Sequence, residues 1–235
     1  MLQEFTLYNK PLSDITDNKI IINTLNAHCY NITRSDSLYE KSLKNSSVLI
    51  PDGISIVWAV RWLTGRNLKK IAGEDLFLFE LSRLQINGGK CFFLGSTEET
   101  LKKIKERIRR EYPKIIVNTY SPPFKSEFNE RDNLDMLDVI NSFQPNVLMI
   151  GMTAPKQEKW AYQHFNQLQV GHICCIGAVF DFYAGTVRRA PKWMINFGLE
   201  WFYRLLKEPE RMWRRYLLGN IIFIWHIINE KLRNR

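Results

Sequence analysis

The sequence of 235 residues is poor in cysteine and histidine and lacks the spacing of a metal site. Its four cysteines, Cys29, Cys91, Cys174 and Cys175, show no CxxC pattern, so we expect buried thiols in a reducing compartment rather than disulfides or a zinc site. Its four histidines show no ligand spacing, and no DxD pair is present to hold a divalent ion on phosphates. We therefore predict no metal and no cofactor.

Long apolar runs are also missing. The longest candidate, Leu217–Ile228, falls short of the roughly 20 apolar residues that a membrane-spanning helix needs. The segment Met1–Lys10 lacks the apolar core of a signal peptide, so we expect a cytoplasmic protein. The absence of GxGxxG and GxSxG motifs argues against a nicotinamide-dependent epimerase and a serine hydrolase.

What is present is a regular alternation of short apolar runs and helical patterns. It predicts an α/β, Rossmann-like, mainly parallel sheet with helices on both faces. Pro122 and Pro123 predict a loop over 121–129, because neither can serve the interior of a helix or a central strand. The predicted strands cover 19–25, 48–51, 90–94, 115–120, 146–150 and 173–176, and the predicted helices 36–44, 54–63, 74–85, 97–112 and 133–143.

Composition changes near Ala190-Pro191. From Arg188 onward, eleven Lys/Arg stand against four Asp/Glu, so this part carries +7 of the net charge of +9. We predict two parts, a core over 1–190 and a basic helical C-terminal appendage over 191–235, which also holds four of the seven tryptophans. Such a basic segment suits an anionic membrane surface. The alternatives are an exposed charged helix face and, without any motif in its favour, nucleic acid.

Asp52 follows the apolar run Val48–Pro51 and precedes Gly53 and a helical pattern. A strand end of a parallel sheet is where ligands bind, so Asp52 is a candidate general base that Gly53 lets approach a ligand. An equally good reading is a helix N-cap. Thr24 and Asn26, at the end of another predicted strand, add polar groups to the same edge.

Glycines follow three further predicted strands. Gly95 opens Gly-Ser-Thr, where a diphosphate could bind the next helix, although an ordinary turn is the better reading of this motif alone. Gly151 opens Gly-Met-Thr-Ala-Pro-Lys-Gln-Glu, where Lys156 and Gln157 could bind a phosphate or a sugar hydroxyl; the alternative is a capped helix with Glu158 and Lys159 on its solvated face. Gly177 opens an aromatic turn with Asp181, whose role the spacing leaves open.

Arginines of the appendage form one further pattern. Arg204, Lys207, Arg211 and Arg214 are spaced by three and four residues, which predicts one side of a helix apart from the break at Pro209.

Several motifs in a fixed order resemble the WecB/TagA/CpsF glycosyltransferases. They are Pro51-Asp52-Gly53, Gly73-Glu74-Asp75-Leu76, Phe93-Leu94-Gly95, Ala154-Pro155-Lys156-Gln157-Glu158-Lys159-Trp160, Gly177-Ala178-Val179-Phe180-Asp181-Phe182, Arg189-Ala190-Pro191-Lys192-Trp193 and Gly198-Leu199-Glu200-Trp201-Phe202-Tyr203-Arg204. The resemblance runs from about Ile20 to the C-terminus.

This resemblance implies an inverting, metal-independent transferase that moves N-acetylmannosamine or its uronate from a UDP-sugar to undecaprenyl-diphosphate-linked N-acetylglucosamine. It implies a peripheral protein on the inner face of the cell membrane and leaves homo-oligomerisation open. Another UDP-hexose as donor, or a UDP-sugar-binding protein without turnover, is the alternative. Asp52, Thr24, Asn26 and Gln157 would be catalytic. The residues expected to bind substrate are Gly53, Gly73, Asp75, Gly95, Gly151, Pro155, Lys156, Gly177, Phe180, Asp181, Arg204, Arg211 and Arg214.

Overall fold

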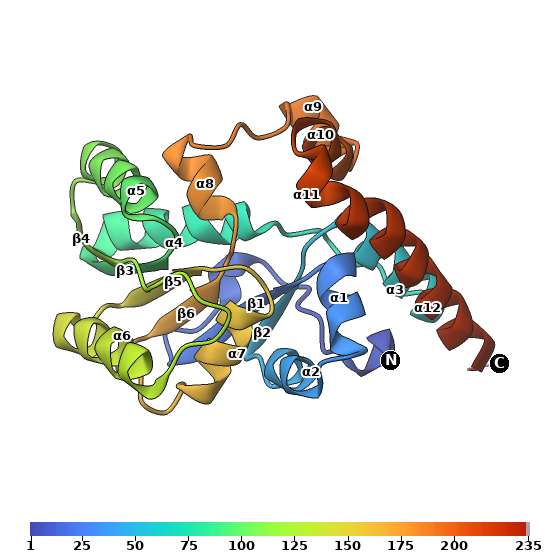
Figure 1. The fold of residues 1–235 in the computed structure, drawn as a ribbon, viewed down its shortest axis with the longest axis horizontal. Coiled ribbons are helices and arrows are strands. Elements are labelled where there is room, and N and C mark those ends of the chain that lie inside the picture. The colour runs from blue at the N-terminus through green and yellow to red at the C-terminus, as the bar shows by residue number, and fades with distance from the viewer. Residues whose placement is uncertain (234–235) are drawn as a thin grey trace.

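The computed structural model describes residues 1–233, which form one six-stranded sheet flanked by helices (Figure 1). The strand order is β2-β1-β6-β5-β3-β4, and every pairing between these strands is parallel. The prediction of an α/β Rossmann-like sheet is confirmed. The strands are β1 (Ile20–Leu25), β2 (Val48–Pro51), β3 (Gly89–Gly95), β4 (Ile115–Tyr120), β5 (Val147–Gly151) and β6 (His172–Cys175).

Helices connect the strands and cover both faces of the sheet (Figure 1). Those of the core are α1 (Ala27–Thr33), α2 (Ser37–Lys44), α3 (Ile54–Thr64), α4 (Gly73–Asn87), α5 (Glu98–Glu111), α6 (Glu130–Phe143), α7 (Lys156–Gln163) and α8 (Val179–Ala184). The C-terminal part holds α9 (Lys192–Asn196), α10 (Glu200–Lys207), α11 (Pro209–Trp213), a π-helical turn η3 (Arg214–Leu218) and α12 (Gly219–Arg233). Two short 3₁₀ turns, η1 (Leu2–Glu4) and η2 (Leu12–Asp14), precede β1.

Alternating side chains of the strands supply two apolar layers, because successive residues of a strand point to opposite faces. Phe93 and Cys174 pack beneath α4, α5 and α8, whereas Phe92 and Cys175 pack beneath α6 and α7. The four cysteines are buried free thiols, as predicted. A third cluster joins α1, α2 and α3 to the N-terminal turn and to α12.

Side-chain caps decide where several helices begin. The side chains of Asn26, Asp36 and Thr97 each accept a hydrogen bond from a backbone N–H in the first turn of α1, α2 and α5. The helix α1 was not predicted, because its seven residues are too few to show a clear period. The helix α6 begins at Glu130, three residues earlier than predicted, because Asn129 caps it.

The C-terminal part is helical, as predicted, and returns to the N-terminal side of the molecule (Figure 1). Phe223 and Ile227 of α12 are buried in the same cluster as Tyr30 of α1. The predicted appendage extends to residue 235, and its last two residues lie outside the described part. Within residues 1–233, no helix combines the length and apolar character needed to cross a membrane.

Candidate active site

A cavity of about 1410 Å³ lies at the carboxyl edge of the sheet. The segments that follow β1, β2, β3, β5 and β6 line it, together with parts of α10, α11, η3 and α12. In open parallel α/β sheets this edge is the usual ligand site. Every residue that the sequence nominated lines the cavity except Asp75 and Arg214.

Asp52 leaves β2 at this edge. Its backbone N–H donates to the carbonyl of Leu25, 2.9 Å away, which ties the turn to β1. Gly53, at φ 112°, is the N-cap of α3, and that cap carries no side-chain hydrogen bond in the described part of the chain. The N-cap reading of Asp52 is therefore wrong, and its carboxylate lines the cavity instead.

The surroundings of Asp52 set its proton affinity. Burial and, secondarily, the charge of Glu200 raise the pKa of Asp52 to about 6, while Lys70, Arg215 and Arg189 oppose the rise. A general base works best when its pKa lies near the working pH, because it is then ionised yet basic enough to take a proton. Asp52 meets this requirement.

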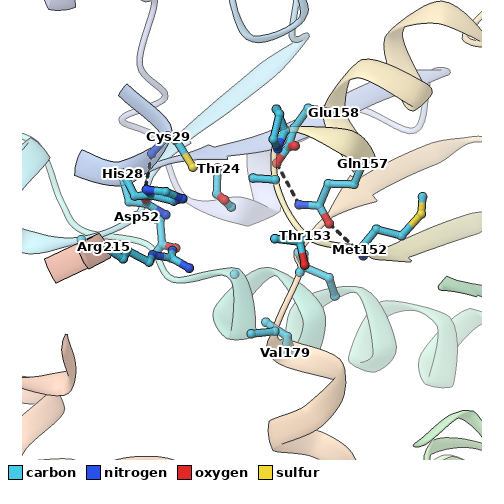
Figure 2. A pocket seen from close by; sticks show the side chains of 18 of the residues that line it. Thr24, His28, Cys29, Asp52, Met152, Thr153, Gln157, Glu158, Val179 and Arg215 are labelled. Carbon is cyan, nitrogen blue, oxygen red and sulfur yellow. Dashed lines mark hydrogen bonds between the residues drawn. The ribbon is translucent and has the colours of Figure 1, made fainter. Parts of the chain in front are cut away.

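His28 and Arg215 lie beside Asp52 (Figure 2). Burial, helped by the positive charge of Arg215, lowers the pKa of His28 to about 4, so its imidazole is neutral at pH 7. The Nε atom of Arg215 is buried and has no hydrogen-bond partner within the described residues. An unpartnered guanidinium N–H on a cavity wall is available to an anionic ligand.

Thr24 and Asn26 stand at the end of β1. Thr24 is buried, and Figure 2 places its hydroxyl between Asp52 and Gln157. Asn26 Oδ1 accepts from the backbone N–H of Cys29 at 3.0 Å and so caps α1. The amide nitrogen of Asn26 is the part of this side chain left to act toward a ligand.

Gln157 is held by two hydrogen bonds (Figure 2). Its Oε1 accepts from the backbone N–H of Met152 at 3.1 Å, and its Nε2 donates to Glu158 Oε1 at 2.8 Å. The side chain therefore fixes the loop after β5, with one amide hydrogen left over.

Glu158 is not on a solvated helix face, contrary to one reading of the sequence. Only 1% of it is exposed, and burial raises its pKa to about 7. Its Oε2 is buried without a partner among the described residues, although Lys159 beside it pairs with Asp36 at 2.9 Å. Helical periodicity in the sequence cannot reveal that Glu158 is buried, because a charged residue near the start of a helix is usually solvated.

Glycine is required where β3, β5 and α8 meet. A Cβ on Gly151 would lie 2.3 Å from the ring of Phe180, and a Cβ on Gly95, which has φ 109°, would lie 2.6 Å from the carbonyl oxygen of Gly151. Any side chain at either position would have to displace a neighbour. Gly177 also lines the cavity, beside the amide of Gln157.

Lys156 lines the cavity from the start of α7, for which Pro155 is the N-cap. Its ammonium donates to the carbonyl of Lys125 at 2.5 Å and lies 3.5 Å from the centre of the Phe128 ring. Lys156 therefore fastens the loop over 121–129, which forms one wall of the cavity.

The appendage brings Arg204, Arg211 and Arg215 to the cavity, and Arg214 lies exposed over the ring of Trp213. Asp181 faces two of these arginines. Burial raises its pKa, and the charges of Arg211 and Arg204 counter the rise. Lys207 and Arg214, which were predicted to share one side of a helix with Arg204 and Arg211 apart from the break at Pro209, do not line the cavity. The helix ends at Lys207 and a π-helical turn begins at Arg214, so a spacing of three and four residues does not keep these side chains on one side.

Asp75 caps its own helix. Its Oδ2 accepts from the backbone N–H of Ala72 at 2.8 Å, at the start of α4. Gly73 lines the cavity and packs on Val179. Arg189 joins this helix to the appendage, since it pairs with Glu74 and, at 3.1 Å, with Glu200.

Sequence reasoning missed His28, Lys70, Arg215 and Trp58 as cavity residues. A signal for Arg215 was present, because it follows Arg211 by four residues, a spacing that returns to one helix face. Lys70 and His28 carried no such signal. No group of three or more potential metal ligands occurs in the part of the chain that the structure describes.

The fold and the site define a Rossmann-like α/β protein. Its cavity, at the carboxyl edge of the sheet, holds an acid, a polar strand end and several arginines. Residues 7–235 match the model of the glycosyl transferase WecG/TagA/CpsF family. The chain belongs to this family, which confirms the resemblance drawn from the motifs.

Its relatives include proteins named N-acetylglucosaminyldiphosphoundecaprenol N-acetyl-beta-D-mannosaminyltransferase. One from Bacillus spizizenii (strain ATCC 23059 / NRRL B-14472 / W23) is 32% identical over 180 residues, covering 76% of this chain and 67% of the relative. One from Bacillus subtilis (strain 168) is 31% identical over 203 residues, covering 86% and 77%. One from Staphylococcus aureus (strain MW2) is 27% identical over 214 residues, covering 91% and 82%.

Proposed function

We propose that this chain transfers N-acetylmannosamine from a UDP-sugar to N-acetylglucosamine carried on a polyprenyl diphosphate. The observation that supports it most is Asp52, a carboxyl with a pKa of about 6 on the wall of a cavity that also holds Arg204, Arg211 and Arg215. The relatives' names supply the sugar and the acceptor.

The reaction is a single displacement with inversion. The acceptor hydroxyl oxygen forms a bond to the anomeric carbon of the donor while the bond from that carbon to the UDP oxygen breaks. The hydroxyl proton passes to Asp52, and UDP leaves with the bonding electrons. Thr24 and the amide of Asn26, which lie at the end of the neighbouring strand, orient the acceptor sugar.

The arginines neutralise diphosphate charge. Guanidinium groups bind phosphate oxygens through paired N–H donors, and this attraction strengthens as charge develops on the departing UDP. Gly95 and Gly151 let the strand ends and α8 pack closely at the edge of the cavity, while Gln157 holds the loop after β5 in place. His28, neutral at pH 7, borders Asp52 without competing with Arg215 for anions.

The acceptor is a lipid, so we place the chain at the inner membrane surface through its C-terminal part. Leu217 and Leu218 are exposed apolar side chains close in sequence to the exposed cation Arg214, and Leu232 is exposed beside the exposed Arg233. Apolar and basic groups together favour an anionic bilayer. Sedimentation with anionic vesicles tests this, and an equal supernatant fraction with and without vesicles would contradict it.

A screen of UDP-sugars tests the transferase. The full chain is incubated with a synthetic prenyl-diphosphate N-acetylglucosamine acceptor, and UDP release is followed. We expect release with UDP-N-acetylmannosamine only when the acceptor is present, with a disaccharide-lipid product by mass spectrometry. Binding of UDP-sugar without acceptor-dependent release would instead identify a binding protein, and faster release with another UDP-hexose would change the donor.

A further inference from the structure

One end of the cavity is apolar. Trp58 and Trp62 of α3 line it from one side, and Ile224 and Ile228 of α12 line it from the other. These four side chains, here called the α3–α12 groove, remain substantially exposed; Trp58 is 66% and Ile224 56% exposed. Phe223 and Ile227, which are buried, form the floor between the two helices.

The groove runs away from the charged part of the cavity. Residues 220–229 of α12 contain no charged side chain, whereas Arg215 stands just before this helix. At the far end, the ammonium of Lys231 donates to the carbonyl of Trp62 at 2.8 Å and so holds α12 against α3. The cavity therefore passes from a cationic region near Asp52 into an uncharged apolar channel.

Building on the proposed function, we propose that the α3–α12 groove binds the first isoprenoid units of the acceptor lipid. In a prenyl diphosphate the apolar chain is bonded directly to the diphosphate. An acceptor whose sugar hydroxyl lies at Asp52 must send its prenyl chain out of the cavity, and the α3–α12 groove is an apolar exit continuous with that cavity. Burying the chain there removes exposed apolar surface of Trp58 and Ile224 from water.

The length of the groove limits what it can hold. From Asn220 to Lys231 the helix α12 rises about 16 Å, at 1.5 Å per residue. Only the proximal isoprenoid units fit within that span, and the rest of the chain continues outside the protein. Each isoprenoid unit that lies within the groove should therefore add to the affinity, whereas units beyond its end should add nothing.

Titration calorimetry of the full chain, without vesicles, tests the groove with geranyl diphosphate and the longer farnesyl diphosphate. We expect farnesyl diphosphate to bind at least about tenfold more tightly, because its extra isoprenoid unit adds five carbons and each buried CH₂ group contributes about 0.8 kcal/mol. Trp58→Ala and Ile224→Ala should abolish that preference. Ile221→Ala and Trp225→Ala are matched controls, because these residues are 65% and 60% exposed on the same helix but do not line the cavity.

Three results would each contradict the proposal that the α3–α12 groove binds isoprenoid units. The first is equal affinity of the wild type for the two ligands. The others are an unchanged preference in Trp58→Ala and Ile224→Ala, and the same loss of preference in the two control variants. Trp58→Phe, which keeps an aromatic ring, should retain the preference, and thermal unfolding of each variant verifies the fold. If only vesicle binding falls in Trp58→Ala, the side chain contacts the bilayer and the proposal fails.

The readout is independent of glycosyl transfer. A chain-length preference without UDP release would support lipid binding in the α3–α12 groove and contradict the proposed transferase activity. Acceptor-dependent UDP release without any chain-length preference would do the reverse.

Discussion

The hydroxyl of Tyr30, in α1, donates a hydrogen bond of 3.0 Å to the carboxylate of Glu230, in α12, across 200 positions of the sequence. The same carboxylate accepts from the backbone N–H groups of Leu2 at 2.7 Å and Gln3 at 3.1 Å. Glu230 is buried, so these three donors are what make its burial tolerable. The last helix is thereby fixed to the first turn of the chain and to a helix beside the candidate site.

Glu230→Gln should loosen this junction. One carboxylate oxygen becomes an NH₂ group facing donors, and we expect a loss of about 1–3 kcal/mol in the free energy of unfolding. Since α12 carries part of the cavity wall, activity should fall as well. Urea unfolding measures the first effect, with the exposed Glu210→Gln of the same segment as a control that should change little. Equal stabilities of the two variants would contradict this role.

Asp52→Asn should remove the general base and leave the fold intact. General-base assistance contributes about 10²–10⁴-fold in rate, so kcat should fall on that scale. Circular dichroism checks the fold, and UDP release gives the rate. A rate close to that of the wild type would exclude Asp52 as the base.

The same substitution should stabilise the protein above pH 6. Because the pKa of Asp52 is raised from 3.8 to about 6 on folding, its ionised form disfavours the folded state, and stability is lost as pH rises between these values. The pKa difference between the unfolded and folded states corresponds to at most about 3 kcal/mol in the free energy of unfolding. Thermal unfolding should show the variant more stable above pH 6 and equal to the wild type below 3.8.

The value of kcat/KM should fall as pH drops below about 6, where Asp52 takes up a proton. The slope should approach about tenfold per pH unit if one group is responsible. A second buried acid, Glu158, has a pKa of about 7 and could also cause the fall of kcat/KM at low pH, the acid limb of the profile. The variant Glu158→Gln distinguishes the two acids. The acid limb should persist in that variant; its disappearance would assign the limb to Glu158.

Arg215→Ala should raise the KM for the donor more than Arg214→Ala does. The two arginines are neighbours in the chain, but only Arg215 lines the cavity and carries a buried unpartnered Nε. Loss of a charge-assisted hydrogen bond to phosphate costs about 1.5–3 kcal/mol, or at least tenfold in affinity. A larger rise of the KM in Arg214→Ala than in Arg215→Ala would contradict the proposal that Arg215 binds the donor.

Gly151→Ala should destabilise the protein and reduce activity, because the new methyl group would meet the Phe180 ring. Displacing a packed aromatic ring costs about 1–3 kcal/mol. Gly219→Ala is the matched control, since the nearest atoms to its added Cβ would be 3.7 Å away and the residue is helical. That change should stabilise α12 by up to about 1 kcal/mol, and denaturant midpoints compare the pair.

The strands and the edge of the sheet were readable from sequence because they depend on local patterns. An aliphatic run that ends in Pro51-Asp52-Gly53 places an acid at a strand end, whatever the rest of the chain does. The same holds for the glycines after β3, β5 and β6. The motifs then identified the family, which no single spacing could do.

Burial and pairing across the chain were not readable. The sequence leaves a solvated alternative for Glu158 open, because nothing nearby in sequence predicts that a carboxyl in the first turn of α7 is buried. The sequence predicts Arg214 rather than Arg215 at the cavity, because a spacing of three or four residues from Arg211 fits both arginines. With the helix broken before Pro209, the spacing does not tell which side faces the cavity. Trp58 and Ile224 meet only because α12 folds back on α3.

The junction at Glu230 also bears on synthesis. Tyr30 and its apolar neighbours emerge from the ribosome early, whereas the helix that covers them is made last. Until then the growing chain presents an uncovered apolar surface, the kind of surface on which partly folded chains aggregate. We therefore expect chaperone capture of nascent chains to end when α12 is released.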